Sequence, residues 1–161
     1  WFSLDVDNRV KPESVALVNS ALIDVTKYGT AKYLSKTLDI QVAGKTGTSD
    51  DLKDSWFAGF SGDVVAVVWT GFDDNRSTGL TGSSGAMKIW SNLMKDVAYT
   101  PYELPDIAGF ENYWIDGTNG LLTEHDCENA LELTFIEGTQ PVQFSDCESS
   151  RGSNWFLELF N

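Results

Sequence analysis

The sequence predicts an α+β protein in which helices pack on a small antiparallel sheet and a separate acidic tail follows. Apolar residues first recur at helical spacing and then in runs of strand length separated by turn residues. The net charge is -1 over residues 1–95 and -12 over residues 96–161. This break in composition indicates a module boundary near Asp96–Pro105, so we expect domains at 1–97 and 98–161.

Three segments have the features of helices. Pro12–Val25 begins with a proline, which suits the first helical turn, and Glu13 suits the positive end of the helix dipole. Its apolar residues repeat at helical spacing, as do those of Gly85–Val97. A short helical piece is expected at Ala31–Leu34. Two serines just before the last helix, Ser83 and Ser84, are expected to cap it.

Three strands are expected between these helices: Ile40–Thr48, Ser55–Ser61 and Val64–Phe72. Ser61-Gly62-Asp63 is a short hairpin signal between the last two. The continuous apolar run Val64–Trp69 predicts a central strand that is buried on both faces.

The acidic tail holds two short strand candidates, Tyr113–Ile115 and Leu131–Ile136, on either side of a Gly-Thr-Asn-Gly turn. It also holds both cysteines. A disulfide between Cys127 and Cys147 would close a loop of about 20 residues and stabilise the tail by roughly 3 kcal/mol in the chain-entropy model. Such a bond indicates an oxidising compartment. Two separate free thiols are the alternative.

Composition excludes several function classes. The negative charge argues against nucleic acid as a partner, because phosphate binding needs cations. The tail is either a solvated, solubilising surface or a docking surface for a basic partner. With one histidine and two cysteines, no metal site is expected. No apolar run is long enough to span a membrane.

The candidate functional residues are Lys45, Thr46, Gly47 and Thr48, at the end of the first expected strand. The lysine supplies a fixed positive charge, and the two threonines can donate hydroxyl hydrogen bonds to a carboxylate. Gly47 lets a ligand lie against the strand. On an open strand edge, the Thr48 N–H can point at a developing oxyanion. These features suit a peptide-like acyl substrate that ends in a carboxylate and adds as an extra strand.

Two other interpretations apply to parts of this stretch. A glycine-bounded turn with a surface lysine explains Lys-Thr-Gly alone. A phosphate-binding loop would need a further glycine five positions before Gly44, where the sequence has Asp39, so that interpretation is set aside.

The order of motifs resembles the C-terminal half of the transpeptidase domain of class A, bifunctional penicillin-binding proteins. The resemblance rests on the segment Gly29-Thr30-Ala31, the strand Val42–Thr48, the run Asp54–Gly59, the strand that ends at Trp69-Thr70-Gly71, and Gly82–Ala86 before a final helix. It is strong over residues 12 to 97. The tail resembles, more loosely, the C-terminal extension of the 1b type. The fold implied is part of the serine transpeptidase/β-lactamase-like fold.

The resemblance implies roles for the four residues. Lys45 would hold charge near the nucleophile and the substrate carboxylate, and Thr46 and Thr48 would bind that carboxylate. The Thr48 N–H would form half of the oxyanion hole. The implied activity is D,D-transpeptidation of D-Ala-D-Ala stem peptides through an acyl-serine, which β-lactams would trap. No metal or organic cofactor is implied.

The nucleophile motifs of this family, Ser-x-x-Lys and Ser-x-Asn, are absent from the sequence. Ser49, Ser84 and Ser91 have lysines four residues on rather than three. We therefore expect that this chain alone is not acylated, and that an upstream part of the same protein carries the nucleophile. The missing strands would leave an exposed edge or face, so the chain should bind that part as a second chain or self-associate.

Further expectations come from the resemblance. The parent enzyme would carry an upstream glycosyltransferase domain and a membrane anchor, and would act at the periplasmic face of the bacterial inner membrane. An outer-membrane lipoprotein activator is the partner expected for the 1b type. A serine β-lactamase or D,D-carboxypeptidase is one alternative, and a non-catalytic binding fragment is the other.

Overall fold

The structure is a computed structural model that describes residues 10–97, 99–106 and 108–146 of the 161-residue chain. The chain divides into two compact units, residues 1–105 and 106–161. Among the described residues, no helix is both long and apolar enough to cross a membrane.

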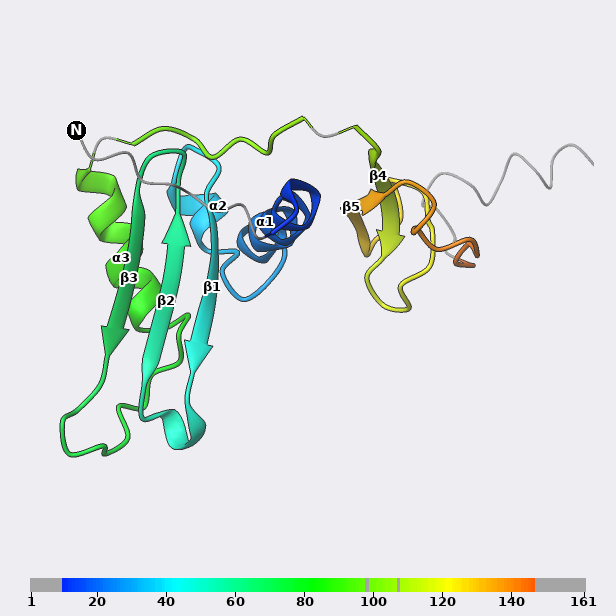
Figure 1. Cartoon of the computed structure of the whole chain (residues 1–161). Helices are drawn as coiled ribbons and strands as arrows, with labels where there is room; N and C mark the ends of the chain where they lie inside the picture. The colour runs from blue at the N-terminus through cyan, green and yellow to red at the C-terminus, as the bar shows by residue number, and fades with distance from the viewer. Residues whose placement is uncertain (1–9, 98, 107, 147–161) are drawn as a thin grey trace, which may run out of the picture. The chain divides into compact units, whose positions relative to one another are not determined.

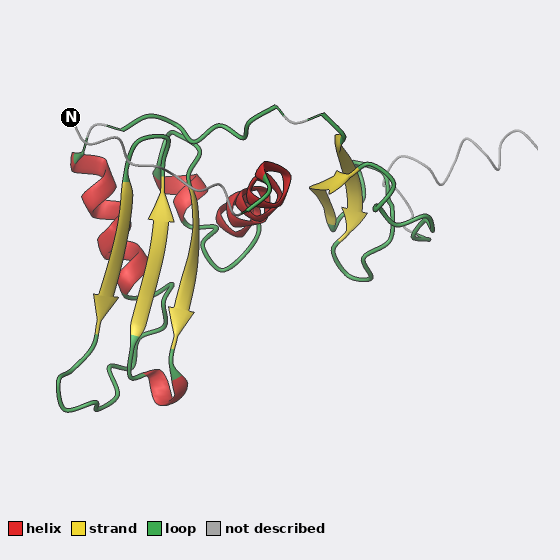
Figure 2. Cartoon of the chain, in the orientation of Figure 1, coloured by secondary structure: helices red, strands yellow, loops and turns green. Residues whose placement is uncertain are grey.

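The first unit contains a three-stranded antiparallel sheet and three α-helices (Figures 1 and 2). Its elements are, in chain order, α1 (Pro12–Lys27), α2 (Leu34–Thr37), β1 (Ala43–Thr48), a 3-10 turn η1 (Asp50–Leu52), β2 (Ser55–Phe60), β3 (Val65–Thr70) and α3 (Ala86–Asp96). The strand order is β1-β2-β3, so β2 is central.

The helix α1 confirms the predicted first helix and continues two residues beyond it. Pro12 occupies the first turn, and the acidic Glu13 and the basic Lys27 lie at the ends where the helix dipole favours them. At its C-terminal end, the buried Thr26 hydroxyl lies 3.0 Å from the carbonyl oxygen of Val42. This contact ties the helix to the residue just before β1.

The hydrophobic core lies on one face of the sheet, where α2 and α3 cover it (Figure 1). The rings of Phe57 and Trp90, both fully buried, meet edge to face with their centroids 5.1 Å apart. The indole N–H of Trp90 also donates to the carbonyl of Ala66, 3.0 Å away, so α3 is bonded to the β3 backbone. The buried core residues are Ala31, Leu34, Leu38, Val42, Phe57, Ala86, Met87, Trp90 and Met94.

The prediction of a central strand at Val64–Trp69 is wrong. That run forms β3, which lies at the edge of the described sheet and alternates between exposed and half-buried residues. Val65 is 78% exposed and Val67 is 58% exposed. A run of β-branched residues predicts a strand, but burial on both faces also needs covering elements, and none in the described residues covers this face.

Two further expectations are corrected. Residues 30–33 form turns, and the short helix begins at Leu34. Ser83 and Ser84 do not cap α3, because its N-cap is Gly85 and makes no side-chain cap bond. Instead, the hydroxyl of Ser55 in β2 accepts from the Ala86 N–H at 2.9 Å.

The second unit is built on a hairpin-like pair, β4 (Phe110–Asp116) and β5 (Ala130–Ile136), which pair antiparallel. Both strands are longer than predicted. The carboxylate of Asp116 accepts four side-chain and backbone bonds from Thr118, Asn119 and Ser145, which shape the turn after β4. Cys127 is buried, and Cys147 lies outside the described residues, so the disulfide stays a prediction.

Candidate functional site on the edge strand β1

The four predicted residues are the last four of the six residues of β1, at the edge of the sheet. Register pairs Lys45 with Ala58 and Gly47 with Trp56, so these residues share one face. Thr46 and Thr48 belong to the opposite face, which carries the core.

The backbone of β1 presents N–H groups to an open edge. The Ser49 N–H donates across to the Asp54 carbonyl of the neighbouring strand segment, 3.1 Å away. Because N–H directions alternate along an antiparallel strand, those of Thr46 and Thr48 point away from β2. No described strand pairs with this edge. It therefore has the geometry to accept an extended ligand.

The lysine lies at this edge. Its ammonium donates to the Thr46 carbonyl at 2.8 Å and lies 3.5 Å from the Thr46 hydroxyl. Within the described residues, no carboxylate forms an ion pair with Lys45. Its charge is exposed and available to an anionic ligand.

A further hydroxyl lies beside Thr46. The Oγ1 of Thr30, in the turn after α1, is 2.7 Å from the Oγ1 of Thr46. In the sequence, Thr30 lies in the segment before the strand and has no feature that predicts a role in the site. Thr30 and Thr46 are 16 residues apart in the chain, so helical or strand periodicity in the sequence does not reveal their contact.

The hydroxyl of Thr48 faces the loop before α3. It accepts from the N–H of Gly82, 2.8 Å away. Sequence reasoning assigned no site role to Gly82 either. Thr30 and Gly82, which come from two separate loops, therefore lie at the site together with the four predicted residues.

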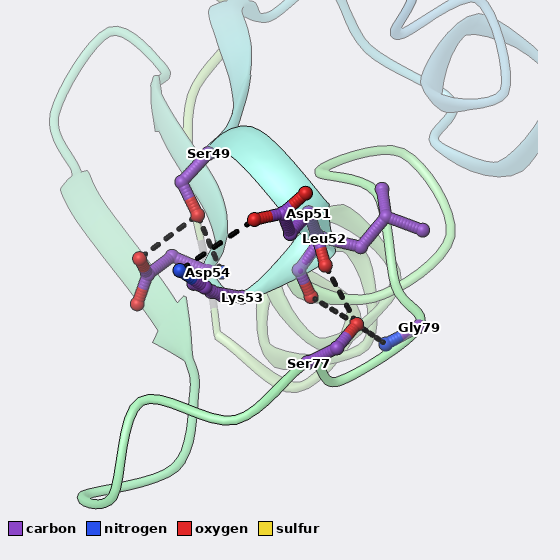
Figure 3. A network of polar contacts seen from close by, with 7 residues as sticks. All are labelled: Ser49, Asp51, Leu52, Lys53, Asp54, Ser77 and Gly79. Carbon is purple, nitrogen blue, oxygen red and sulfur yellow. Dashed lines mark hydrogen bonds and ion pairs between the residues drawn. The ribbon is translucent and has the colours of Figure 1, made fainter.

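A polar turn holds the end of β1 beside β2 (Figure 3). The Ser49 hydroxyl donates to one carboxylate oxygen of Asp54 at 2.9 Å and accepts from the Asp54 N–H at 2.7 Å. The other carboxylate oxygen accepts from the indole N–H of Trp69 in β3, also at 2.9 Å. The turn is thus connected to all three strands and fixes the strand end that carries Thr48.

Apart from the buried Ala43 and the half-buried Phe60 at one end, the face of the sheet that carries Lys45 is apolar and exposed. We call its residues the open face: Trp56, Ala58, Val65, Val67 and Trp69. The rings of Trp56 and Trp69 lie 6.1 Å apart, and both side chains are nearly half exposed. Contiguous exposed apolar residues of this kind mark an interaction surface.

The first unit thus has helices packed on one face of an antiparallel sheet, with Lys45–Thr48 on the strand at its open edge. Residues 4–95 match the family model of the penicillin binding protein transpeptidase domain. The chain belongs to this family.

Known relatives cover nearly the whole chain. It is 34% identical over 157 residues to penicillin-binding protein 1B of Vibrio cholerae, which covers 96% of this chain and 20% of the relative. It is 39% identical over 149 residues to penicillin-binding protein 1A of Aquifex aeolicus, covering 88% of this chain and 20% of that protein. The chain thus spans about a fifth of these relatives.

A solved structure has the same fold. The crystal structure of penicillin-binding protein 1A from Haemophilus influenzae aligns with a TM-score of 0.61 at 29% sequence identity. The alignment covers 80% of this chain and 21% of that one.

Proposed function

We propose that this chain is the substrate-binding portion of a peptidoglycan D,D-transpeptidase. The observation that carries the proposal is the placement of Lys45, Thr46 and Thr48 at an open strand edge in a chain of the transpeptidase family. A stem peptide would add along β1, with its terminal carboxylate at the Thr46 and Thr48 hydroxyls and the Lys45 ammonium. Its scissile carbonyl would meet the Thr48 N–H.

The nucleophile belongs, on this proposal, to an upstream part of the same protein. The open face supports it, because Lys45 shares that face with exposed apolar residues that a further segment can cover. A serine presented from that segment would lie near the lysine charge. The Thr48 N–H and the serine's own N–H would then stabilise the oxyanion together.

The experiment uses a chimera in which this chain replaces the matching stretch of Vibrio cholerae penicillin-binding protein 1B. We expect a fluorescent penicillin to label the chimera covalently. Lys45→Ala should slow labelling by about 100-fold, as for other fixed groups that stabilise the transition state. The chain alone should gain no adduct in intact-mass analysis. A chimera that folds but is not labelled, or an adduct on the 161-residue chain, contradicts the proposal.

The remaining parts of the proposal come from the family. They are an upstream glycosyltransferase domain, action at the periplasmic face of the inner membrane, β-lactam binding, and regulation by an outer-membrane lipoprotein. The Cys127–Cys147 disulfide belongs to the proposal too.

A further inference from the structure

The loop before α3 reaches the site through one residue, Gly82, and only a glycine fits there. A Cβ atom at this position would lie 2.6 Å from the Gly47 carbonyl oxygen, 2.7 Å from the Trp56 carbonyl oxygen and 2.9 Å from the Gly47 nitrogen. These are backbone atoms of the β1–β2 ladder and have little freedom to move. The missing side chain therefore allows the loop backbone to lie directly on the ladder.

Bonds before and after Gly82 in the chain hold it in place. Before it, the hydroxyl of Ser77 donates to the carbonyl of Asp51 at 2.7 Å, and Thr78 donates twice to the carbonyl of Leu52 (Figure 3 shows the Ser77 contacts). The buried Ser55 hydroxyl donates to the Thr81 carbonyl at 2.8 Å and, after Gly82, accepts from the Ala86 N–H at 2.9 Å. The loop is thus anchored to the turn after β1 and to the start of β2.

This contact constrains the Thr48 hydroxyl. A hydroxyl has one proton to donate and two lone pairs that accept. The Gly82 N–H occupies one lone pair, and in the described part of the chain the Thr48 hydroxyl donates to no acceptor. Its proton is left for an acceptor outside the chain, and a carboxylate would form the strong, charge-assisted bond.

We infer that Gly82 is a positioning residue that orients the Thr48 hydroxyl as a donor to the substrate carboxylate. The inference rests on the proposed function. It adds a specific prediction, because disturbing Gly82 should weaken recognition of the carboxylate rather than acylation in general.

The test compares acylation of the chimera by a penicillin with a free carboxylate and by its methyl ester. Gly82→Ala should lower the second-order rate constant for the acid about tenfold or more, the loss expected for a bond to a charged group. The rate with the ester should change much less. Thr48→Val should show the same pattern, and Thr48→Ser, which keeps the hydroxyl, should restore the preference for the acid.

Gly79→Ala is the matched control. It makes the same change in the same loop, at a strained backbone angle (φ +68°), but no heavy atom lies within 4 Å of the added carbon. Its ratio of acid to ester rates should stay that of the unsubstituted chimera. Equal slowing of both substrates by Gly82→Ala, or no change in the ratio, overturns the inference while leaving the proposed function intact.

A second measurement needs no activity. In the 161-residue chain, the amide proton of Gly82 should shift upfield in NMR spectra of Thr48→Val and stay near its position in Thr48→Ser. An unmoved Gly82 resonance in Thr48→Val contradicts the hydrogen bond itself. If the unsubstituted chimera is not acylated, the proposed function fails, and the inference fails with it whatever the amide shows.

Discussion

At the scale of single residues, the buried hydroxyl of Ser55 has two partners. It donates to the Thr81 carbonyl and accepts from the N–H of Ala86, which is fully buried. It therefore performs the capping role that the sequence assigned to Ser83 and Ser84. A cap supplied by another strand cannot be read from the residues next to a helix.

Ser55→Ala should lower the free energy of unfolding by about 1–3 kcal/mol, because a buried N–H loses its acceptor. Urea unfolding of the 161-residue chain, followed by the fluorescence of its tryptophans, measures this loss. The matched control is Ser35→Ala, because the exposed Ser35 hydroxyl bonds, among the described residues, only to the nearby Lys32 carbonyl. The control should change stability by less than about 0.5 kcal/mol. Equal losses in the two variants would contradict a structural role for Ser55.

The carboxylate of Asp116 gives the second unit a dependence on acid. The hydrogen bond from Ser145, followed by those from Thr118 and Asn119, holds the Asp116 pKa below its ordinary value of 3.8. Since the folded pKa is lowered, the stabilisation is fully present above pH 3.8 and is lost as the pH falls through the folded pKa.

NMR titration of the Asp116 carboxyl should give a midpoint below 3.8. Ser145→Ala removes the largest cause of the shift and should move the midpoint upward, toward the ordinary value. Asp116→Asn should make the stability of this unit less sensitive to pH below 3.8. A midpoint at or above 3.8 in the unsubstituted chain would show that these bonds do not favour the charged form.

At the scale of elements, local sequence patterns predicted which segments form helices and strands, but they did not predict which faces of these elements are buried. Pro12 and the acidic Glu13 at its start, together with the helical spacing of apolar residues, were enough to predict α1. The turn residues 61–63 were enough to separate β2 from β3. The apolar composition of β3 did not reveal its exposure, because burial depends on which other elements cover a strand. The same limit applies to the site.

Lys45–Thr48 could be recognised from sequence because the four residues are adjacent and their order is specific. Thr30 and Gly82 could not, because each joins the site through a single contact across 16 and 34 residues. Tertiary contacts of this kind leave no periodic signal. A glycine in a loop predicts a turn, whereas Gly82 is needed for close approach to a strand.

The open face and the free edge of β3 should make the isolated chain self-associate. Val67→Lys places a charge on the open face, at a residue that is 58% exposed, and should lower the association without unfolding the chain. Sedimentation velocity at several concentrations measures it. Val142→Lys in the second unit, where the valine is 87% exposed, is the control and should leave the association unchanged. A chain that is monomeric without any substitution would contradict this expectation.

At the scale of the whole molecule, the residues between the last helix and the second unit pack on the first. The Tyr102 N–H donates to the Gln41 carbonyl at 2.9 Å. The side-chain amide of Gln41 donates to the Tyr102 carbonyl, also at 2.9 Å. Its ring meets that of Phe60 edge to face, and its hydroxyl accepts from the side chain of Asn19. The charge break near residue 96 therefore precedes the point where the contacts of the first unit end.

A chain that stops after residue 105 should accordingly be more stable than one that stops after residue 97. The difference should be about 2–4 kcal/mol, from one aromatic pair and several hydrogen bonds. Urea unfolding of the two truncated chains measures it, and Tyr102→Ala in the longer chain should account for most of the loss. Equal stability of the two chains would instead place the domain boundary at residue 97, where the composition alone predicts it.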